Sequence, residues 1–323
     1  LELSEQRVVI GHDGNVAAIE PVKRLDSHRL IEEFMIAANI AAAEALERKD
    51  APCMYRVHDR PSLEKLEGLR EALAPLGITI TRGQVIKPQH FQRIVSQAAG
   101  RPEMETVSMA VLRSQAQAEY NQHNIGHFGL ALRRYAHFTS PIRRYSDLLV
   151  HRSLITAYDL GDDGLTAEDG EKFAEFGKHI SATERRAIDA EREANDRYKA
   201  AYLAEQVGIE FEAKVNGVHR AGLFVTLTDT GADGLVPMSM IGDDQYNLDH
   251  KKQQIKARGT GKIFTIGTLL KVRLEEANIQ TGSLVFSLVT GTSDGRKRGA
   301  SRKKRQRGQR KRKEKIVKLN KSR

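Results

Sequence analysis

The pattern of this chain changes at Gly208, and that change limits its possible folds more than any other feature. Before Gly208, apolar side chains recur at helical spacing over long stretches. From Ile209 to about residue 290, the apolar runs are short and of strand length. The sequence therefore predicts an α+β protein with mixed helices and strands over 1–207, an all-β domain over 208–290, and a separate tail over 291–323.

The tail carries all of the excess positive charge. Residues 291–323 contain 16 Lys and Arg but only two acidic residues, Asp294 and Glu314. The other 290 residues contain 36 basic and 40 acidic residues, although the net charge of the whole chain is +10. A segment of this composition cannot bury apolar surface, so we expect a disordered tail that neutralises phosphates. The alternative is a tail that only increases solubility.

The first part reads as a β-hairpin followed mainly by helices. Alternating apolar residues around His12-Asp-Gly-Asn15 predict a hairpin within residues 1–25. Helical periodicity, caps and stops predict the elements that follow. These are a helix from Asp26 or Ser27 to about Lys49, a strand near 54–58, a helix over 62–76 stopped by Gly77, helices near 88–99 and 103–117, a strand over 127–132, a helix from Ser140 to about Tyr158, a helical stretch from Thr166, and a helix from a capping box at Ser181-Ala-Thr-Glu184 to about Gln206.

One short stretch of this part indicates anion binding. Ser140-Pro141 is a typical helix start, because serine is a good N-cap and proline suits the first helical position. Arg143 and Arg144 would then lie in the first turn, where the helix dipole attracts anions and repels cations. Two arginines at this end indicate a bound anion, most commonly phosphate. The alternative is that Arg143 pairs with Asp147 one turn later, as an exposed ion pair.

The residues around this stretch resemble a known family. Three motifs are similar to the signature of the ribonuclease II/ribonuclease R family, and to ribonuclease R most of all: Gly126-His-Phe-Gly-Leu-Ala-Leu132, Tyr135-Ala-His-Phe-Thr-Ser-Pro-Ile-Arg-Arg-Tyr-Ser-Asp147 and His151-Arg152. The resemblance implies a processive 3′→5′ exoribonuclease that degrades single-stranded RNA to nucleoside 5′-monophosphates. It covers nearly the whole chain to about residue 290, and it implies that residues 1–207 are the C-terminal part of an RNB catalytic domain.

The resemblance also implies roles for individual residues. Arg143 would clamp the phosphate near the scissile bond, since a guanidinium can donate two parallel hydrogen bonds, and Ser140 would help to complete the anion site. Arg144 would hold the next phosphate or anchor the fold, and Tyr145 would line the RNA channel or pack in the core. Glu191 matches a glutamate that acts near the scissile end of the RNA in some members and is absent from others.

Five short apolar runs in the second part predict a small barrel of the OB type. They cover residues 211–215, 222–227, 234–236, 269–274 and 283–288. Gly217-Val-x-x-Ala-Gly-Leu-Phe-Val-Thr-Leu and Asp233-Gly-Leu-Val-Pro-Met-Ser-Met resemble the S1 RNA-binding domain. That resemblance implies that single strands bind by stacking bases on aromatic side chains beside a basic groove.

The stacking surface of this domain is small. Phe224 occupies the position of a stacking aromatic residue, although it could instead belong to the core. Ala221, Leu223 and Pro237 depart from the aromatic and histidine residues that are common in the family. Polar residues would compensate for them: Lys214, His219, Arg220, Arg273 and Asn278. We expect modest affinity with little sequence preference.

The metal-binding residues of the family do not occur in this sequence. Phosphodiester hydrolysis at neutral pH usually needs metal ions, and Mg²⁺ requires several carboxylates close together. In the family these come from an aspartate cluster upstream of the signature, which is absent here; Glu32-Glu33, Asp162-Asp163 and Asp243-Asp244 lack its pattern. We therefore expect Mg²⁺ to act in a complete enzyme and this chain alone to be inactive or nearly so.

The remaining expectations concern location and partners. Cys53 is the single cysteine and fits a reducing cytoplasm. No apolar run is long enough to span a membrane, and the start at Leu1 without a leader is compatible with a fragment. We expect a monomer that binds single-stranded and structured RNA, with the ribosome or RNA-decay factors as further partners. The alternatives are a noncatalytic RNA-binding protein derived from this family, or a ribosome-associated S1 factor.

Overall fold

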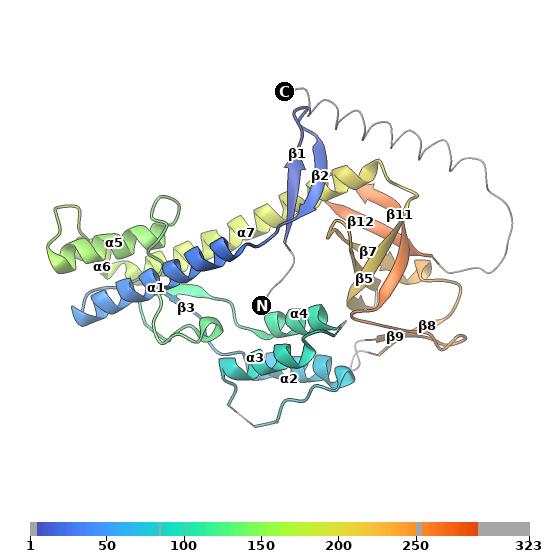
Figure 1. The fold of residues 1–323 in the computed structure, drawn as a ribbon, viewed down its shortest axis with the longest axis horizontal. Coiled ribbons are helices and arrows are strands. Elements are labelled where there is room, and N and C mark those ends of the chain that lie inside the picture. Colours follow the sequence, from blue (N-terminus) through green and yellow to red (C-terminus); the bar gives the residue numbers. More distant parts are fainter. Residues whose placement is uncertain (1–4, 84, 102, 250–253, 290–323) are drawn as a thin grey trace. The chain divides into compact units, whose positions relative to one another are not determined.

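The computed structural model describes residues 5–83, 85–101, 103–249 and 254–289. Three separate clusters of buried apolar side chains organise this part of the chain. The first lies between the two longest helices, the second within a group of three helices, and the third inside a β-barrel (Figure 1). The Lys/Arg-rich tail lies outside the described residues, so the expectation that it is disordered stays a prediction.

The N-terminal hairpin is present where the sequence predicts it. Strands β1 (Gln6–Ile10) and β2 (Val16–Pro21) pair antiparallel, and the first long helix follows. This helix, α1 (Asp26–Arg48), buries only residues in its C-terminal half, Asn39, Ala42, Ala43 and Leu46. The hairpin contacts the last long helix, α7 (Phe173–Ala204), as Figure 1 shows.

A two-stranded sheet and helices form the cluster that positions the signature residues. Strand β3 (Tyr55–Val57) pairs antiparallel with β4 (Glu119–Asn121), a strand that the sequence did not predict. Helix α5 (Tyr145–Tyr158) packs on both α1 and α7, and the short α6 (Ala167–Glu171) leads into α7. Gly177 of α7 allows this packing, because a Cβ at that position would lie 2.7 Å from the Tyr120 carbonyl oxygen of β4.

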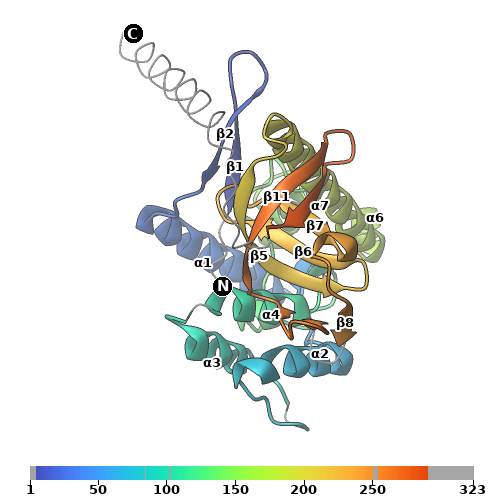
Figure 2. The same ribbon diagram turned by 90° about the vertical axis from the view of Figure 1, so that its right-hand side faces the viewer.

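The predicted helices between β3 and β4 are also confirmed. They are α2 (Leu63–Leu73), continued by a 3₁₀ turn η1 (Ala74–Leu76), α3 (Pro88–Ala98) and α4 (Met104–Ser114). Gly77 ends the first of them in the left-handed conformation (φ 73°), as expected for a helix stop. Leucines at helical spacing on α2 face the buried residues of α3 and α4. Figure 2 shows α2, α3 and α4 grouped together.

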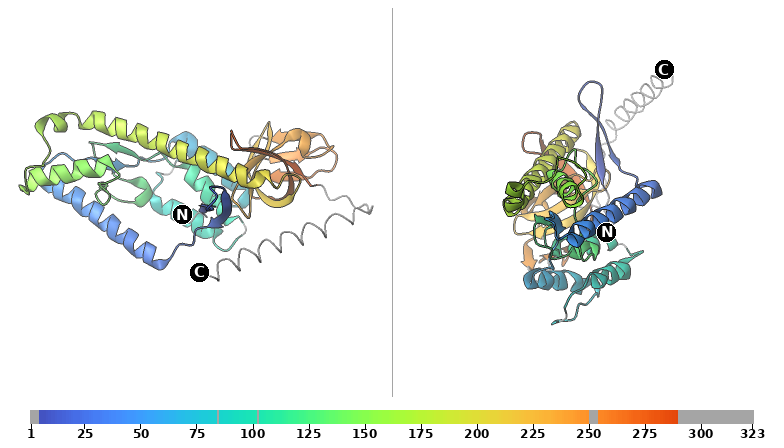
Figure 3. Two further views of the ribbon diagram at one scale, coloured as in Figure 1. Left: turned by 90° about the horizontal axis from the view of Figure 1, so that it is seen from above. Right: turned by 90° about the vertical axis from the view of Figure 1, so that its left-hand side faces the viewer.

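The C-terminal part folds into a closed five-stranded barrel with the strand order β11-β12-β7-β6-β5. Its strands match the five predicted runs: β5 (Glu210–His219), β6 (Gly222–Leu227), β7 (Asp233–Pro237), β11 (Leu269–Asn278) and β12 (Ser283–Leu288). Gly222 permits close contact between β6 and β7, because a Cβ there would lie 2.0 Å from the Val236 carbonyl oxygen. The last turns of α7 pack on the barrel core through Ala200 and Leu203 (Figure 3).

Between β7 and β11 lies a second sheet that the sequence did not predict. It has the order β10-β9-β8 and follows a short 3₁₀ turn, η3 (Met238–Met240). Its strands are β8 (Tyr246–Asp249), β9 (Gln254–Ala257) and β10 (Ile263–Thr265).

Three predicted elements are wrong. Residues 127–132 do not form a strand; they form a 3₁₀ turn, η2 (Phe128–Leu130), closed by a bridge between His127 and Leu132. Ser181 does not begin a helix, because it lies inside α7, which is continuous over 32 residues. The helix of the signature begins at Tyr145 rather than at Ser140.

Among the helices of the described residues, none is both long and apolar enough to cross a membrane.

Candidate nucleic-acid interface

The stretch from Ser140 to Arg144 is a turn held by a buried carboxylate. Backbone N–H groups of Arg143 and Arg144 both donate to the Ser140 carbonyl oxygen, which closes the turn before α5 starts. The Asp147 carboxylate lies in the first turn of α5 and is fully buried. It accepts a hydrogen bond of 2.8 Å from the Ser140 backbone N–H. An acidic residue, not two arginines, therefore occupies the first turn of this helix, as the helix dipole favours.

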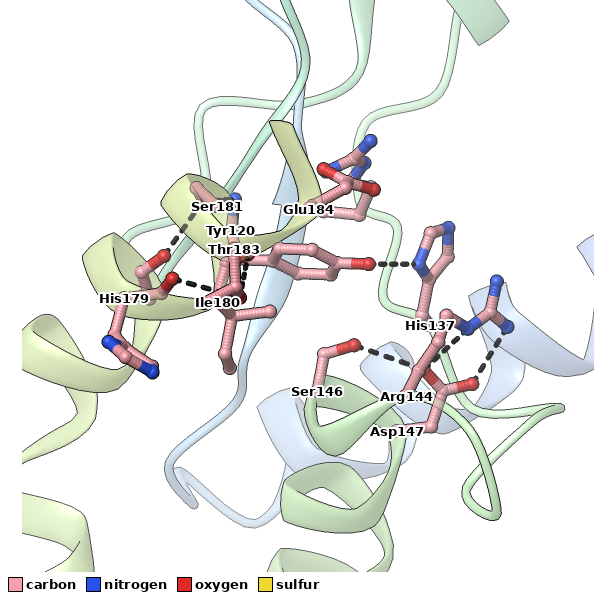
Figure 4. Close-up of polar contacts among 12 residues, drawn as sticks. Tyr120, His137, Arg144, Ser146, Asp147, His179, Ile180, Ser181, Thr183 and Glu184 are labelled. Carbon is pink, nitrogen blue, oxygen red and sulfur yellow. Dashed lines mark hydrogen bonds and ion pairs between the residues drawn. The ribbon is translucent and has the colours of Figure 1, made fainter. Parts of the chain in front are cut away.

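The two arginines of the turn differ in their contacts. Arg144 donates to both oxygens of Asp147, with Nε at 2.9 Å from Oδ2 and Nη2 at 2.8 Å from Oδ1 (Figure 4). The Ser146 hydroxyl donates the fourth hydrogen bond to this carboxylate, at 3.0 Å. Arg143 is exposed, and no partner of its guanidinium occurs among the described residues. Arg144, not Arg143, therefore makes the predicted ion pair with Asp147, and Arg143 stays accessible to a ligand.

Ser140 and Tyr145 frame this turn. Ser140 does not cap a helix, because α5 begins at Tyr145 and the N-cap position belongs to Arg144. Tyr145 is 45% exposed and places its ring edge against Phe176 of α7, with 5.9 Å between centroids. Part of the Tyr145 ring is thus packed and part is accessible. Arg143 and Arg144 do not lie in the first turn of a helix, so that prediction is wrong, but the accessible Arg143 remains a candidate phosphate ligand.

A second layer of polar side chains supports the turn from inside. The Tyr120 hydroxyl of β4 forms a hydrogen bond of 2.9 Å with His137 Nδ1, as Figure 4 shows. Burial, together with the nearby positive charges of Arg144 and Arg56, lowers the pKa of His137 to about 3. His137 is therefore neutral at physiological pH, so its Nδ1 is able to accept a hydrogen bond from the Tyr120 hydroxyl. Burial also raises the pKa of Tyr120, which keeps its hydroxyl protonated.

Further contacts join this layer to α1 and α5. Asn39 of α1 donates to the Tyr135 hydroxyl at 3.0 Å and accepts from the Phe138 backbone N–H at 2.8 Å. His151 stacks on Phe138 with ring centroids 4.2 Å apart. Burial, together with the positive charge of neighbouring groups, lowers the pKa of His127 to about 4. Most of the aromatic residues of the signature thus pack against other side chains or form hydrogen bonds within the protein.

The carboxylate that α7 places in this cluster is Glu184. It accepts a hydrogen bond of 2.7 Å from Arg56, whose guanidinium lies 4.6 Å from the centroid of the Tyr120 ring. Figure 4 shows Glu184 beside the Tyr120 ring, and its charge acts on the Tyr120 hydroxyl. Glu191, the predicted residue, lies two turns later on an exposed position of α7 and has no polar partner among the described residues.

The barrel presents Phe224 on its outer surface. On β6, Leu223, Val225 and Leu227 point inward and are at most 1% exposed, whereas Phe224 is 44% exposed. The alternative that Phe224 belongs to the core is therefore excluded. Its ring lies over Gly217 of the paired strand and 6.5 Å from the His219 ring. Phe224 and His219 form an accessible aromatic pair of the kind on which a base can stack.

The basic residues predicted for the barrel are not all in one place. His219 and Arg220 lie exposed at the end of β5, close to Phe224 in the strand register. Lys214 pairs with Thr226, one outward position away from Phe224. Arg273 instead lies opposite Glu210 at the other end of β5 and bonds to that carboxylate at 3.0 Å. The structure therefore groups His219, Arg220 and Lys214 near Phe224 and separates Arg273 from them.

The described residues do not fit a magnesium site. Among them, no group of three or more His, Cys, Asp and Glu side chains is placed to hold a metal ion. Asp244 instead accepts hydrogen bonds from the Gly259 and Thr260 backbone N–H groups and so fixes a turn. Asp162 and Asp163 lie exposed in a loop.

Sequence reasoning missed three residues of this interface. Asp147 was considered only as a partner of Arg143, although it is the acceptor for the whole turn. Ser181 accepts from the Tyr120 backbone N–H at 2.9 Å, and Glu184 pairs with Arg56. Both contacts join α7 to residues more than 60 positions away, so no local pattern could have indicated them.

The sequence of this chain is similar to that of a known domain family and of known proteins. Residues 1–159 match the RNB domain family. The chain is 40% identical over 313 residues to ribonuclease R of Vibrio parahaemolyticus, which covers 94% of this chain and 38% of that protein. It is 41% identical over 288 residues to ribonuclease R of Aquifex aeolicus, which covers 89% of this chain and 41% of that protein.

The fold of this chain is also similar to solved structures of RNase R. The apo form of Mycoplasma genitalium RNase R has a TM-score of 0.83 at 27% identity, over 89% of this chain and 46% of that one. The same protein in complex with ribose methylated single-stranded RNA has a TM-score of 0.82, again at 27% identity over 89% of this chain and 46% of that one. The chain thus spans less than half the length of the relatives it matches. Together these similarities show that the chain belongs to the ribonuclease II/ribonuclease R family.

Proposed function

We propose that this chain is the RNA-holding part of a 3′→5′ exoribonuclease that degrades single-stranded RNA processively to nucleoside 5′-monophosphates. The observation that carries this proposal is the contrast between the two arginines of the turn. Arg144 is fully engaged by a buried carboxylate, while Arg143 is exposed without a partner among the described residues. A family member that keeps one guanidinium free on a rigid turn is equipped to hold a phosphate.

The chemistry of Arg143 suits this role. A guanidinium presents its N–H donors in a planar fork that matches two phosphate oxygens, which an ammonium group cannot do. The turn that carries Arg143 is fixed at both ends by Asp147, through Ser140 and Arg144. A preorganised turn loses little entropy when it binds, so most of the hydrogen-bond energy is available for holding the RNA. Arg144 therefore acts as the anchor of the turn, and Arg143 as its ligand-binding residue.

The barrel and the tail would extend the binding of RNA away from this turn. We assign the barrel to the S1 type of the OB fold, with Phe224 as the stacking residue and His219, Arg220 and Lys214 beside it. Each stacked base contributes about 1–3 kcal/mol, so a single aromatic position supports only modest affinity. The Lys/Arg-rich tail would add a salt-dependent, sequence-independent attraction. Structures of Mycoplasma genitalium RNase R with single- and double-stranded RNA support both RNA classes as ligands.

Hydrolysis would depend on a part of the protein that this chain does not contain. Because the described residues do not fit a metal site, the Mg²⁺ of the complete enzyme would be held by carboxylates outside this chain. We therefore propose that the chain alone binds RNA and does not cut it. We also propose that the complete protein is a cytoplasmic monomer that meets ribosomes or RNA-decay factors. The noncatalytic alternative is less favoured, because the relatives of the chain include ribonuclease R proteins.

A hydrolysis assay tests the proposal. The chain and the full-length protein would each be incubated with 5′-labelled single-stranded RNA and Mg²⁺, and the products separated by length. We expect the full-length protein to shorten the RNA from its 3′ end and to release nucleoside monophosphates, while the chain only shifts the RNA in a binding assay. Release of monophosphates by the chain alone would contradict the division of roles. An inactive full-length protein that still binds RNA would support the noncatalytic alternative.

A further inference from the structure

A strongly acidic surface lies at the end of the helical part, away from the residues assigned to RNA. Residues 159–175, which comprise the α5–α6 loop, α6 and the start of α7, contain seven acidic residues and a single basic residue, Lys172. Glu168 pairs with Lys172 at 2.6 Å, and Asp169 pairs with Arg152 at 3.0 Å. The other five are exposed and have no ion-pair partner in the described part of the chain: Asp159, Asp162, Asp163, Glu171 and Glu175.

An apolar cavity opens beside these carboxylates. Its volume is about 500 Å³, within the range of small-ligand and side-chain pockets. Pro52, Ala157 and Leu165 are among the residues that form its apolar wall, and Glu171 of the acidic surface also lines it. The cavity lies between α5, the segment 51–52 and the start of α6, so its wall is built by packed elements rather than by one loop.

One buried hydroxyl in this cavity lacks a partner among the described residues. Ser153 of α5 lines the cavity and is only 1% exposed, and its hydroxyl makes no hydrogen bond to any residue that the structure describes. A buried hydroxyl without a partner costs about 1–3 kcal/mol, so a group that satisfied it would be favoured. Serines of helices commonly bond to a carbonyl one turn earlier, as Ser181 does with Gly177 at 2.7 Å, but Ser153 does not.

We propose that this acidic surface and its cavity form a docking site for a basic peptide segment of a protein partner. An apolar side chain of the peptide would fill the cavity, and a backbone group beside it would bond to the Ser153 hydroxyl. Lysines or arginines on either side would face the unpaired carboxylates. Such complementarity selects the partner by charge and speeds its association.

The charges exclude RNA as the occupant. A surface with five unpaired carboxylates repels phosphate groups, so it cannot belong to the RNA path proposed above. The cavity has mostly apolar walls and no basic residue among those that line it, so it also offers no cation to hold a phosphate. Leu160 lies 70% exposed within the acidic stretch and adds apolar contact area for a peptide. The kind of partner that fits is therefore a protein with an exposed Lys- or Arg-rich segment that contains an apolar residue.

Peptide binding to the full chain tests this inference. The probe is a fluorescein-labelled lysine-rich peptide with one central leucine, compared by anisotropy with the same peptide carrying serine in place of leucine. We expect the leucine peptide to bind at least tenfold more tightly than the serine peptide. The triple variant Asp162→Asn/Asp163→Asn/Glu171→Gln should weaken its binding at least tenfold. A matched control, Asp189→Asn/Glu193→Gln/Glu205→Gln, removes the same number of charges elsewhere and should change the affinity less than twofold.

A second variant tests the cavity itself. Ala157→Leu places a larger side chain in the cavity and should reduce the affinity of the leucine peptide to that of the serine peptide, while circular dichroism shows an unchanged fold. Equal binding of the two peptides, or wild-type affinity in the triple variant, would overturn the proposal. A loss of single-stranded RNA binding in the triple variant would assign the surface to RNA instead. Loss of a dimer in sedimentation experiments would assign it to a second copy of the chain. Either result would also refute the peptide site.

Discussion

Replacing Asp147 with asparagine removes the acceptor that organises the signature turn. The carboxylate is fully buried and accepts four hydrogen bonds, one from the Ser140 backbone, two from Arg144 and one from Ser146. Asparagine has nearly the same shape but only one oxygen, and its amide N–H₂ would face donors. The variant therefore keeps the packing and loses the charge, the ion pair and about half of the hydrogen bonds.

The expected cost follows from these contacts. A hydrogen bond to a charged group contributes about 1.5–3 kcal/mol, and breaking a buried ion pair from one side costs about 3–5 kcal/mol. The side chain of Arg144 is 21% exposed, so water can solvate part of the freed guanidinium. The cost of breaking this ion pair should therefore lie at the lower end of the range of about 3–5 kcal/mol. We expect a loss of about 3 kcal/mol in the free energy of unfolding. At an unfolding entropy of about 2.1 cal/mol/K per residue, that loss lowers the melting temperature of a chain of 323 residues by about 4–5 °C.

Thermal unfolding followed by circular dichroism measures this loss. Asp159→Asn is the matched control, since it makes the same chemical change at the exposed end of the same helix and should cost less than about 0.5 kcal/mol. We also expect Asp147→Asn to weaken the binding of single-stranded RNA, because Arg143 then sits on a loosened turn. A melting temperature within 2 °C of the wild type would refute the role assigned to Asp147.

Three further predictions concern the buried histidines, the barrel and the tail. The pKa values of His137 (about 3) and His127 (about 4) lie below the ordinary value, so the unfolded chain binds more protons and stability should fall as the pH drops from about 6.5 toward 4. Unfolding in urea at pH 7 and pH 5 measures this fall in stability. His137→Gln should make the fall less steep by about 1 kcal/mol per pH unit. An equally steep fall in the variant would contradict the low pKa of His137. Phe224→Ala should weaken single-stranded RNA binding by about 1–3 kcal/mol without changing the melting temperature, and His219→Ala should weaken the binding less. Unchanged affinity of Phe224→Ala in a filter-binding assay would exclude stacking on Phe224. Deleting residues 291–323 should flatten the plot of log affinity against log salt concentration, and an unchanged slope would favour the purely solubilising role.

The barrel and most helices could be predicted because their signals are local. Alternation on β6 places Leu223 and Val225 inward, and Gly77 ends a helix by its own backbone preference. The same alternation decides the orientation of Phe224 once the strand is known. The strands β8–β10 were missed because polar residues interrupt their short apolar runs.

The site was predicted only in outline because its contacts are not local. Ser140-Pro141 carries a strong helix-start signal, but Asp147 bonds back to the Ser140 backbone and holds those residues in a turn instead. Ser181 and Thr183 look like the beginning of a helix, yet each hydroxyl bonds to a carbonyl one turn earlier inside α7. The identity of the arginine that stays free could not be read from spacing, since both Arg143 and Arg144 lie within reach of Asp147.

The central claim is that Arg143 holds an RNA phosphate while Arg144 only anchors the turn. The most direct test measures the affinity of this chain for single-stranded RNA over a range of salt concentrations, together with melting temperatures. Arg143→Gln should lower the affinity and reduce the salt slope by about 0.7, the value for one phosphate contact on a single strand, at an unchanged melting temperature. Arg48→Gln, which removes one exposed charge at the end of α1, should leave both affinity and slope nearly unchanged. An affinity and slope of Arg143→Gln equal to those of the wild type would contradict the claim.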